Sequence, residues 1–182
     1  MNKIRYADDD TESVRFLMRL RVPSLAIGLL LGLGLSFLTS RFEEVLTTHV
    51  AITFFIPFIV YIAAAVGTQT QSIYVRDLES GRADFKTYLV KETALGILLG
   101  VIFSVITAAI VMLWFNSPNL TMAISLSVFG AVASAPLIAL VVAELFQLEH
   151  TDPAVGAGPI STIIQDAASV LIYGLTASAI LL

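Results

Sequence analysis

The chain has 182 residues, of which 57% are hydrophobic and 13% are charged. A soluble domain carries roughly 45–50% apolar and about 25% charged residues, so the composition argues against a soluble globular enzyme, a disordered tail or a nucleic-acid-binding protein. The formal net charge of −4 gives no basic footprint for DNA or RNA. The sequence has no cysteine, which excludes disulfides, iron–sulfur clusters and thiolate zinc sites, and His49 and His150 lie too far apart to form a ligand pair.

Five apolar stretches are long enough to cross a bilayer, which takes about 20 helical residues. They run over about 22–40, 50–75, 93–115, 121–147 and 158–182. The first three contain no Asp, Glu, Lys or Arg, the fourth contains only Glu144 and the fifth only Asp166. Because lipid offers no partner to free backbone groups, each stretch is expected to be helical. We therefore predict an all-α membrane protein, with residues 1–21 as a cytoplasmic N-terminal lead and residues 22–182 as a five-helix transmembrane domain.

The positive residues predict the orientation, because cytoplasmic loops are enriched in Lys and Arg. Nine of the ten lie before the first stretch or between the second and third, and Arg41 is the exception. The N-terminus is therefore expected to be cytoplasmic and the C-terminus external, with Trp114 and Phe115 in an external aromatic belt. The compact chain without a targeting signal indicates a multi-pass protein of a prokaryotic inner membrane.

Small residues predict packing faces on two of the expected helices. Gly28 and Gly32 are one helical turn apart with Gly34 close by, and Gly96 and Gly100 repeat the spacing. Such pairs let helix backbones approach closely in membranes. These residues indicate packing and no chemistry.

Asp166 is the strongest functional candidate, because an ionisable group at membrane depth is costly. It lies about eight residues into the fifth stretch, roughly 12 Å along a helix. Two interpretations remain from the residues alone. Asp166 is either part of an ion or proton pathway, or a packing residue that is protonated or hydrogen-bonded.

The segment before Asp166 supports the first interpretation. Asp152 followed by Pro153 is a good helix start, a capping carboxylate and then a proline in the first turn. On a continuous helix, Asp152 and Asp166 lie within about 40° of the same face. Pro159 removes a backbone donor on that face, and Thr162 lies one turn before Asp166. Carboxylates, hydroxyls and a free carbonyl suit a hard cation that prefers oxygen ligands, although Asp152 alone would be only a helix cap.

Other polar residues fall within or beside the second, third and fourth stretches. Thr68, Gln71 and Ser72 share a helix face by i, i+3, i+4 spacing. They either form hydrogen bonds between helices or line a water-filled path. Glu92 immediately precedes the third stretch and Glu144 lies near the end of the fourth, and each is either a solvated end charge or faces an ion entrance.

Several motifs, in order, resemble the transmembrane domain of MgtE-type divalent cation transporters. The last helix of that family is matched by Asp152-Pro153-Ala154, Gly158-Pro159, Thr162, Gln165-Asp166 and Tyr173. Its second helix and following loop are matched by Pro57, Gly67-Thr68-Gln69, Arg76-Asp77-Leu78 and Gly81. Its third and fourth helices are matched by Lys91-Glu92, Gly96, Gly100 and Pro136-Leu137. The resemblance covers the chain from about Arg19 onward.

The resemblance implies a homodimer with a cation pore between the protomers, no enzymatic activity, and no cofactor beyond Mg²⁺ as the transported ion. The aspartate matching Asp166 holds a largely hydrated Mg²⁺, in agreement with the reluctance of this ion to lose water. Asp152, Glu92 and the region of Thr68 would be further polar contacts. The expected partners are a divalent ion, membrane lipid and a second copy of the chain.

Two departures from the family pattern bear on this expectation. The family has Gly-Gly-Asn where this chain has Ala63-Ala64-Ala65, so Ala65 lacks a pore-side amide and ion selectivity and pore shape are expected to differ. Bacterial relatives carry a large cytoplasmic magnesium-sensing region, whereas about twenty residues precede the first stretch here. Regulation by a separate subunit, or by another means, is therefore expected.

Two alternative functions are compatible with the same residues. One is a proton- or sodium-coupled secondary cation transporter in which Asp166 carries the coupling ion. The other is a non-transporting membrane subunit that anchors a regulatory partner. Oxygen ligands accept Mg²⁺, Ca²⁺, Mn²⁺ and other divalent ions, so the residues leave selectivity open.

Overall fold

The computed structural model describes residues 10–148 and 153–182, and all regular structure in these ranges is helical. The elements are α1 (Val14–Ser40), α2 (Glu43–Thr48), the 3-10 helix η1 (Val50–Phe55), α3 (Ile56–Glu79), α4 (Phe85–Phe115), α5 (Pro118–Leu148) and α6 (Pro153–Leu181). Five of these, with η1 counted as part of α3, are long and apolar enough to cross a membrane. The predicted all-α architecture with five spans is confirmed.

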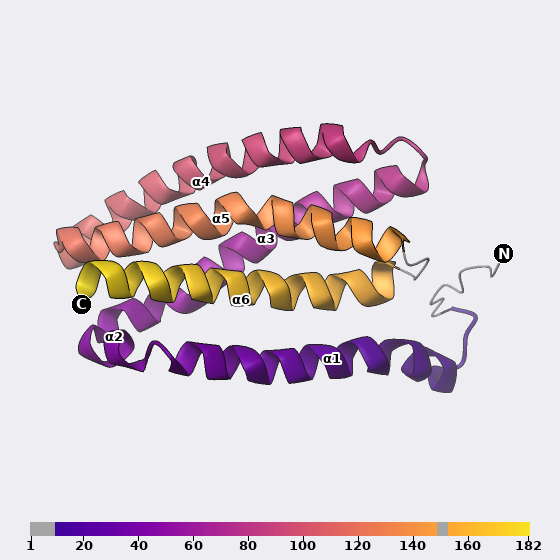
Figure 1. Cartoon of the computed structure of the whole chain (residues 1–182), viewed down its shortest axis with the longest axis horizontal. Coiled ribbons are helices and arrows are strands. Elements are labelled where there is room, and N and C mark those ends of the chain that lie inside the picture. Colours follow the sequence, from indigo (N-terminus) through magenta and orange to yellow (C-terminus); the bar gives the residue numbers. More distant parts are fainter. Residues whose placement is uncertain (1–9, 149–152) are drawn as a thin grey trace.

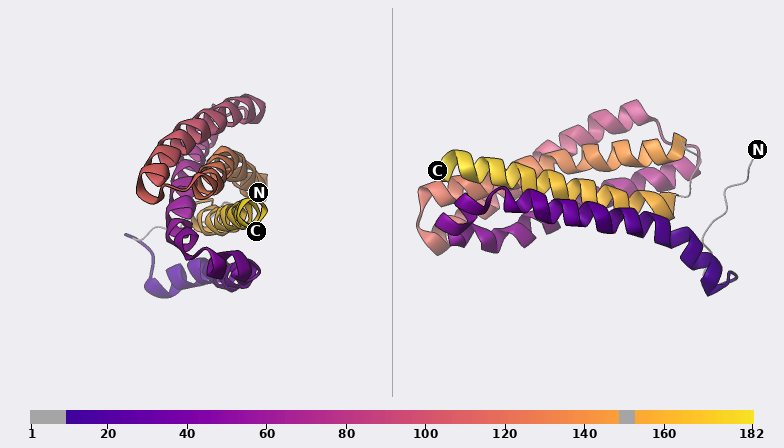
Figure 2. Two further views of the ribbon diagram at one scale, coloured as in Figure 1. Left: turned by 90° about the vertical axis from the view of Figure 1, so that its left-hand side faces the viewer. Right: turned by 60° about the horizontal axis from the view of Figure 1, so that its bottom comes forward.

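Four of the long helices form a layer, and the fifth crosses it. Figure 1 shows α4, α5, α6 and α1 side by side in this order, with α3 crossing behind α5 and α6. The end-on view in Figure 2 places α3 on one side of the layer. The buried core lies where η1 and α3 meet α5 and α6, and includes Ile52, Ile59, Val128, Val132 and Tyr173.

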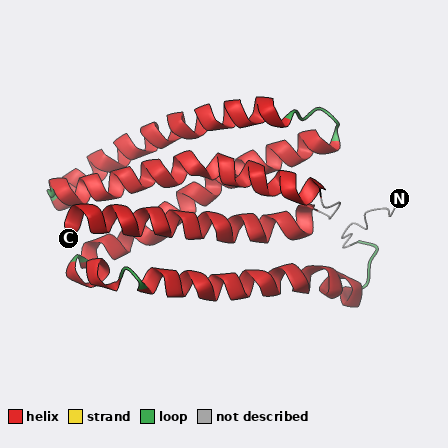
Figure 3. Cartoon of the chain, in the orientation of Figure 1, coloured by secondary structure: helices red, strands yellow, loops and turns green. Residues whose placement is uncertain are grey.

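The two ends of the bundle differ in the chain segments that they hold. The start of α1, the α3–α4 turn and the start of α6 lie at one end, and α2, the α4–α5 turn and the C-terminus lie at the other (Figures 1 and 3). Arg19 and Arg21 near the start of α1 therefore share an end with Arg82 and Lys86 of the α3–α4 region. We refer to it below as the basic end.

The helices differ from the predicted spans mainly at their basic ends. α1 begins at Val14 rather than near Val22, and α4 begins at Phe85 rather than near Thr93. Both early starts are capped, since Ser13 accepts a hydrogen bond from the backbone of Phe16 and Asp84 accepts one from the backbone of Thr87. Hydropathy marks only the apolar part of a helix, whereas these charged first turns are stabilised by their caps.

Two short elements were not indicated by the sequence pattern. α2 follows the first span, and residues 50–55 form a 3-10 helix where an α-helix was predicted. Two hydrogen bonds connect this region to α6. The hydroxyl of Tyr173 donates to the carbonyl of Ile52 over 2.6 Å, and Nε2 of His49 lies 3.1 Å from the carbonyl oxygen of Leu181. Tertiary contacts therefore shape this connection.

The predicted packing face on α4 is confirmed. A Cβ atom on Gly96 would lie 2.7 Å from the carbonyl oxygen of Ala133, and one on Gly100 would lie 3.1 Å from that of Phe129. The two glycines therefore let α4 approach the backbone of α5 more closely than any larger residue permits.

The corresponding prediction for α1 is not supported within the described chain. A Cβ on Gly28 or Gly34 would meet nothing within 4 Å, and one on Gly32 would only touch Ile163 at 3.9 Å. None of the described residues of α1 is buried, and this helix packs mainly against α6. Small residues thus mark a close helix contact on α4 but not on α1.

The turn between α3 and α4 ends α3 with a glycine motif. Gly81 adopts a left-handed backbone with φ of 69°, which glycine tolerates without strain. Its N–H donates to the carbonyl of Leu78, and the N–H of Arg82 donates to that of Asp77. These are the two hydrogen bonds of a Schellman cap, which explains physically why Asp77-Leu78 and Gly81 occur together.

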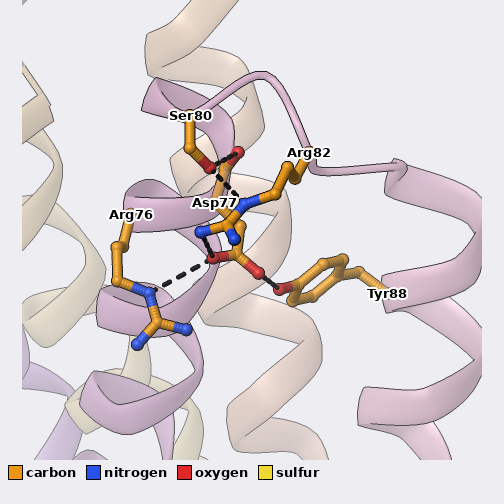
Figure 4. A network of polar contacts seen from close by, with 5 residues as sticks. All are labelled: Arg76, Asp77, Ser80, Arg82 and Tyr88. Atoms are coloured by element: carbon orange, nitrogen blue, oxygen red, sulfur yellow. Dashed lines mark hydrogen bonds and ion pairs between the residues drawn. The ribbon is translucent and has the colours of Figure 1, made fainter.

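The side chain of Asp77 also connects the turn to α4 (Figure 4). Its Oδ2 accepts a hydrogen bond of 2.6 Å from the hydroxyl of Tyr88, and its Oδ1 lies 3.2 Å from Nε of Arg76 and 3.6 Å from Nη2 of Arg82. One carboxylate thus holds the end of α3, the turn and the first turns of α4 together at the basic end.

Candidate functional site

Asp166 lies on α6 and is half-buried. Its Oδ1 atom is buried, and no described residue donates a hydrogen bond to it. Buried polar atoms are almost always hydrogen-bonded in proteins. We therefore expect this oxygen to contact a partner from outside the described residues. Among the described residues, no hydrogen bond to Oδ1 supports the interpretation of Asp166 as a hydrogen-bonded packing residue.

The helical repeat places Asp166 on a defined face of α6. At about 100° per residue, Thr162 lies within about 40° of Asp166 and Tyr173 within about 20°. Tyr173 is buried and contacts η1 through Ile52, whereas Thr162 is exposed. Along this stripe, Tyr173 is buried, Asp166 is half-buried and Thr162, nearer the basic end, is exposed.

Glu92, near the basic end of α4, is buried with 8% of its surface exposed. Thr70 of α3 donates a hydrogen bond of 2.7 Å to its Oε2. The interpretation of Glu92 as a solvated end charge is therefore wrong. Its carboxylate is enclosed between α3 and α4.

Glu144 on α5 has a similar connection to α3. It is half-buried, and the hydroxyl of Tyr74 donates a hydrogen bond of 2.5 Å to its Oε2. Thr70 and Tyr74 lie one turn apart on the buried face of α3 and hold one carboxylate each. Sequence reasoning missed both donors. The two residues are spaced i, i+4 on the side of the helix opposite Thr68, and this spacing indicates a second polar face on α3.

The exposed face of α3 is polar in the half of the helix nearer the basic end. Thr68 and Ser72 are exposed, and Gln71 and Ala65 are half-buried. Within the described part of the chain, none of the three polar side chains forms a hydrogen bond. The described chain therefore shows no hydrogen bond between helices for Thr68, Gln71 or Ser72. Polar groups facing hydrocarbon are costly, so this face of α3 fits contact with water or a second protein.

The predicted site residues do not gather into one metal cluster. Over residues 10–148 and 153–182, no group of three or more His, Cys, Asp or Glu side chains could hold a metal ion. Asp152 lies outside the described residues, and Pro159 falls inside α6 with its side chain outside the described part. The described residues therefore supply no complete set of metal ligands around Asp166.

An ion-transporting membrane protein is expected to combine several spans with polar groups among them. Here there are five candidate spans, a polar face on α3 and a carboxylate on α6 whose buried Oδ1 has no partner among the described residues. Residues 56–176 match the family described as MgtE, divalent cation transporter, and the chain belongs to this family. The resemblance inferred from the motifs is thus confirmed. The family is one of transporters and not of enzymes, as expected from the sequence.

Three curated relatives extend the comparison. The magnesium transporters MgtE of Bacillus subtilis, Enterococcus faecalis and Thermus thermophilus are each 28% identical to the chain over 156 residues, which is 84% of its length. The aligned part is 35% of the Bacillus protein and 34% of the other two. The chain therefore spans about a third of the length of these relatives.

Proposed function

We propose that the protein is a homodimeric, channel-like transporter of divalent cations, with Mg²⁺ as its main substrate. The observation that carries the proposal is the buried Oδ1 of Asp166, which accepts no hydrogen bond from the described chain. A carboxylate oxygen without a donor is a suitable contact for a hydrated cation, because Mg²⁺ keeps several of its waters and is often bound through one or two carboxylates. The names of the relatives support Mg²⁺ as the ion.

The proposed homodimer is supported by the Asp166 carboxylate, whose buried Oδ1 has no partner among the described residues, and by the polar face of α3. A two-fold axis presents the same face of both protomers to one ion, so two copies of Asp166 would share it. Dimerisation along α3 would also remove Thr68 and Ser72, which are exposed on the protomer, from lipid. The pore would then be lined by α3 and α6 of both copies, with Thr68, Gln71 and Ser72 as water contacts.

The basic end is proposed to face the cytoplasm of a prokaryotic cell, in line with the positive-inside rule. A membrane potential negative inside then drives cations inward, with about 2.3 kcal/mol per charge per 100 mV. Glu92 and Glu144 would lie near the inner end of the path. The aromatic residues Trp114 and Phe115 would lie at the external interface.

Transport by the purified protein tests the proposal directly. In proteoliposomes containing a Mg²⁺ indicator, we expect Mg²⁺ entry that increases with an inside-negative potential and persists when proton and sodium gradients are collapsed. Loss of entry on collapsing either gradient would favour the coupled secondary transporter. Absence of flux, with the protein recovered in a stable complex with another chain, would favour the non-transporting subunit.

Substitution of Ala65 tests the proposed role of α3 in selectivity. Ala65→Asn adds an amide to the outward stripe that also contains Ser72, within reach of water bound to the ion. One added hydrogen bond is worth about 1 kcal/mol, so the ratio of Mg²⁺ to Ca²⁺ flux is expected to change roughly fivefold. Ala65→Val adds bulk without an amide and is the control. Equal effects of both substitutions on the ratio would contradict the prediction.

A further inference from the structure

Two adjacent residues of α6 hold the buried polar atoms that lack a partner. Among the described side chains, these atoms are Oε1 of Gln165 and Oδ1 of Asp166. Gln165 is the more enclosed residue, with 3% of its surface exposed. An apolar side chain of similar size would fill the same space without an unpartnered acceptor. Packing alone therefore does not account for a glutamine at this position.

The amide nitrogen of Gln165 connects α6 to α5. Nε2 donates to the backbone carbonyl of Ala131 over 3.4 Å and to Oγ of Ser169 over 3.4 Å. The hydroxyl of Ser169 in turn donates to the carbonyl of Gln165 over 2.8 Å. The hydrogen bond to Ala131 runs between two helices, and the two with Ser169 stay within α6 and hold the amide in place.

The helices approach closely beside this connection. A Cβ on Gly130 of α5 would lie 2.9 Å from Cγ2 of Ile172 on α6. Dense packing of this kind does not deform continuously. α5 and α6 are thus closely packed beside Ala131, and rotation of α6 would break the bond of Gln165 to Ala131.

This connection determines where Asp166 points. Neighbouring side chains on a helix are about 100° apart, so with Gln165 directed at α5, Asp166 points about a quarter turn away, along the stripe of Tyr173. Tyr173 is itself held by the carbonyl of Ile52. Gln165 and Tyr173 together define the rotation of α6 about its own axis.

We propose that Gln165 is a positioning residue for cation transport. Its amide holds α6 in the rotation that directs the Asp166 carboxylate into the ion path, and Gln165 itself does not contact the ion. The inference rests on the proposed function, since it assigns Gln165 a role through Asp166.

The absence of cysteine from the chain allows a test by single cysteines. Asp166→Cys and Ala167→Cys are each made in the full chain, in proteoliposomes, and their rates of modification by a small cationic methanethiosulfonate are measured. Ala167 lines an apolar groove between α1 and α6. The Asp166→Cys thiol is therefore expected to react fast and the Ala167→Cys thiol slowly.

The same two rates are then measured with Gln165→Met, which keeps the length of the side chain and removes its hydrogen bonds. We expect the rate at position 166 to fall and that at position 167 to rise, each about fivefold, the equivalent of one hydrogen bond. With Asp166 intact, Gln165→Met is expected to lower Mg²⁺ flux by a similar factor. Ser169→Ala removes one of the two acceptors of the Gln165 amide and is expected to change the rates and the flux in the same direction, but less. It replaces Gln165→Met in the test if that variant does not assemble.

Ser127→Ala is the matched control. Ser127 is buried on α5, but its hydroxyl donates to the carbonyl of Ala123 on the same helix, so flux and both rates should stay unchanged. Unchanged rates and flux with Gln165→Met and with Ser169→Ala would overturn the positioning role and leave the proposed function intact. A slow reaction of Asp166→Cys in the otherwise unchanged chain would contradict the proposed function, and the positioning role with it.

Discussion

Asp166→Asn is expected to lower Mg²⁺ flux at least about tenfold while the protein still folds and dimerises. Asparagine has nearly the same shape as aspartate but no charge. The buried Oδ1 of Asp166 has no hydrogen bond within the described chain that the substitution could break. A tenfold loss corresponds to about 1.4 kcal/mol, a modest fraction of the interaction between a carboxylate and a divalent ion. Flux is measured in proteoliposomes, and the oligomeric state by size in detergent.

Binding gives a second measurement for this substitution. A ligand that binds only the folded state adds about 2.7 kcal/mol of stability at a hundredfold excess over its dissociation constant. Mg²⁺ is therefore expected to raise the thermal midpoint of the unchanged protein more than that of Asp166→Asn.

The control is Asp84→Asn, the same chemical change at the exposed cap of α4. Hydrogen bonds from Thr87 lower the pKa of Asp84, and asparagine caps a helix about as well as aspartate, so flux should be retained. Equal flux in Asp166→Asn and the unchanged protein would contradict the proposed ion path.

Gly96→Ala is expected to destabilise the packing of α4 against α5. Its Cβ would lie 2.7 Å from the carbonyl oxygen of Ala133 and 3.1 Å from Cγ of Pro136. The carbonyl belongs to the backbone of α5, so α4 and α5 must separate. Overpacking of this kind costs about 1–3 kcal/mol, more than the up to about 1 kcal/mol gained from the higher helix propensity of alanine. The thermal midpoint in detergent should therefore decrease.

Gly34→Ala is the matched control on α1. A Cβ there would meet nothing within 4 Å in the protomer, so only the gain in helix propensity remains and the midpoint should stay equal or increase. A decrease for Gly34→Ala, together with loss of the dimer, would instead locate a contact between protomers on α1. An unchanged midpoint for Gly96→Ala would contradict the close α4–α5 packing.

The five spans were predictable because hydropathy is a local property of the sequence. The first residue of each helix was not predictable from hydropathy. α4, for example, starts two turns before the predicted span, at a cap formed by Asp84 and Thr87 that has no hydropathy signal. The same holds for η1, whose 3-10 geometry accompanies long-range contacts of Ile52 with Tyr173. Glycine spacing predicted the α4–α5 contact but gave the same signal on α1, where the structure shows none.

The candidate site was predictable only where a residue conflicts with its local surroundings. Asp166 was found because a charge in an apolar stretch is unusual in any fold. The hydrogen bond of Thr70 to Glu92 was not predictable, because the two residues lie on different helices and the sequence does not indicate which helix faces meet. Gln165 was noted only as part of a motif. Its role follows from the contact with Ala131, which the sequence alone does not indicate.

The attachment of α1 has a consequence for assembly of the protein in the bilayer. Its main neighbour is α6, the last of the five spans to be synthesised. Until α6 enters the membrane, α1 must remain inserted as a solitary helix, held there by its own hydrophobicity and by the arginines at its start. Packing of the five helices thus waits for α6, which is also the helix that carries Asp166.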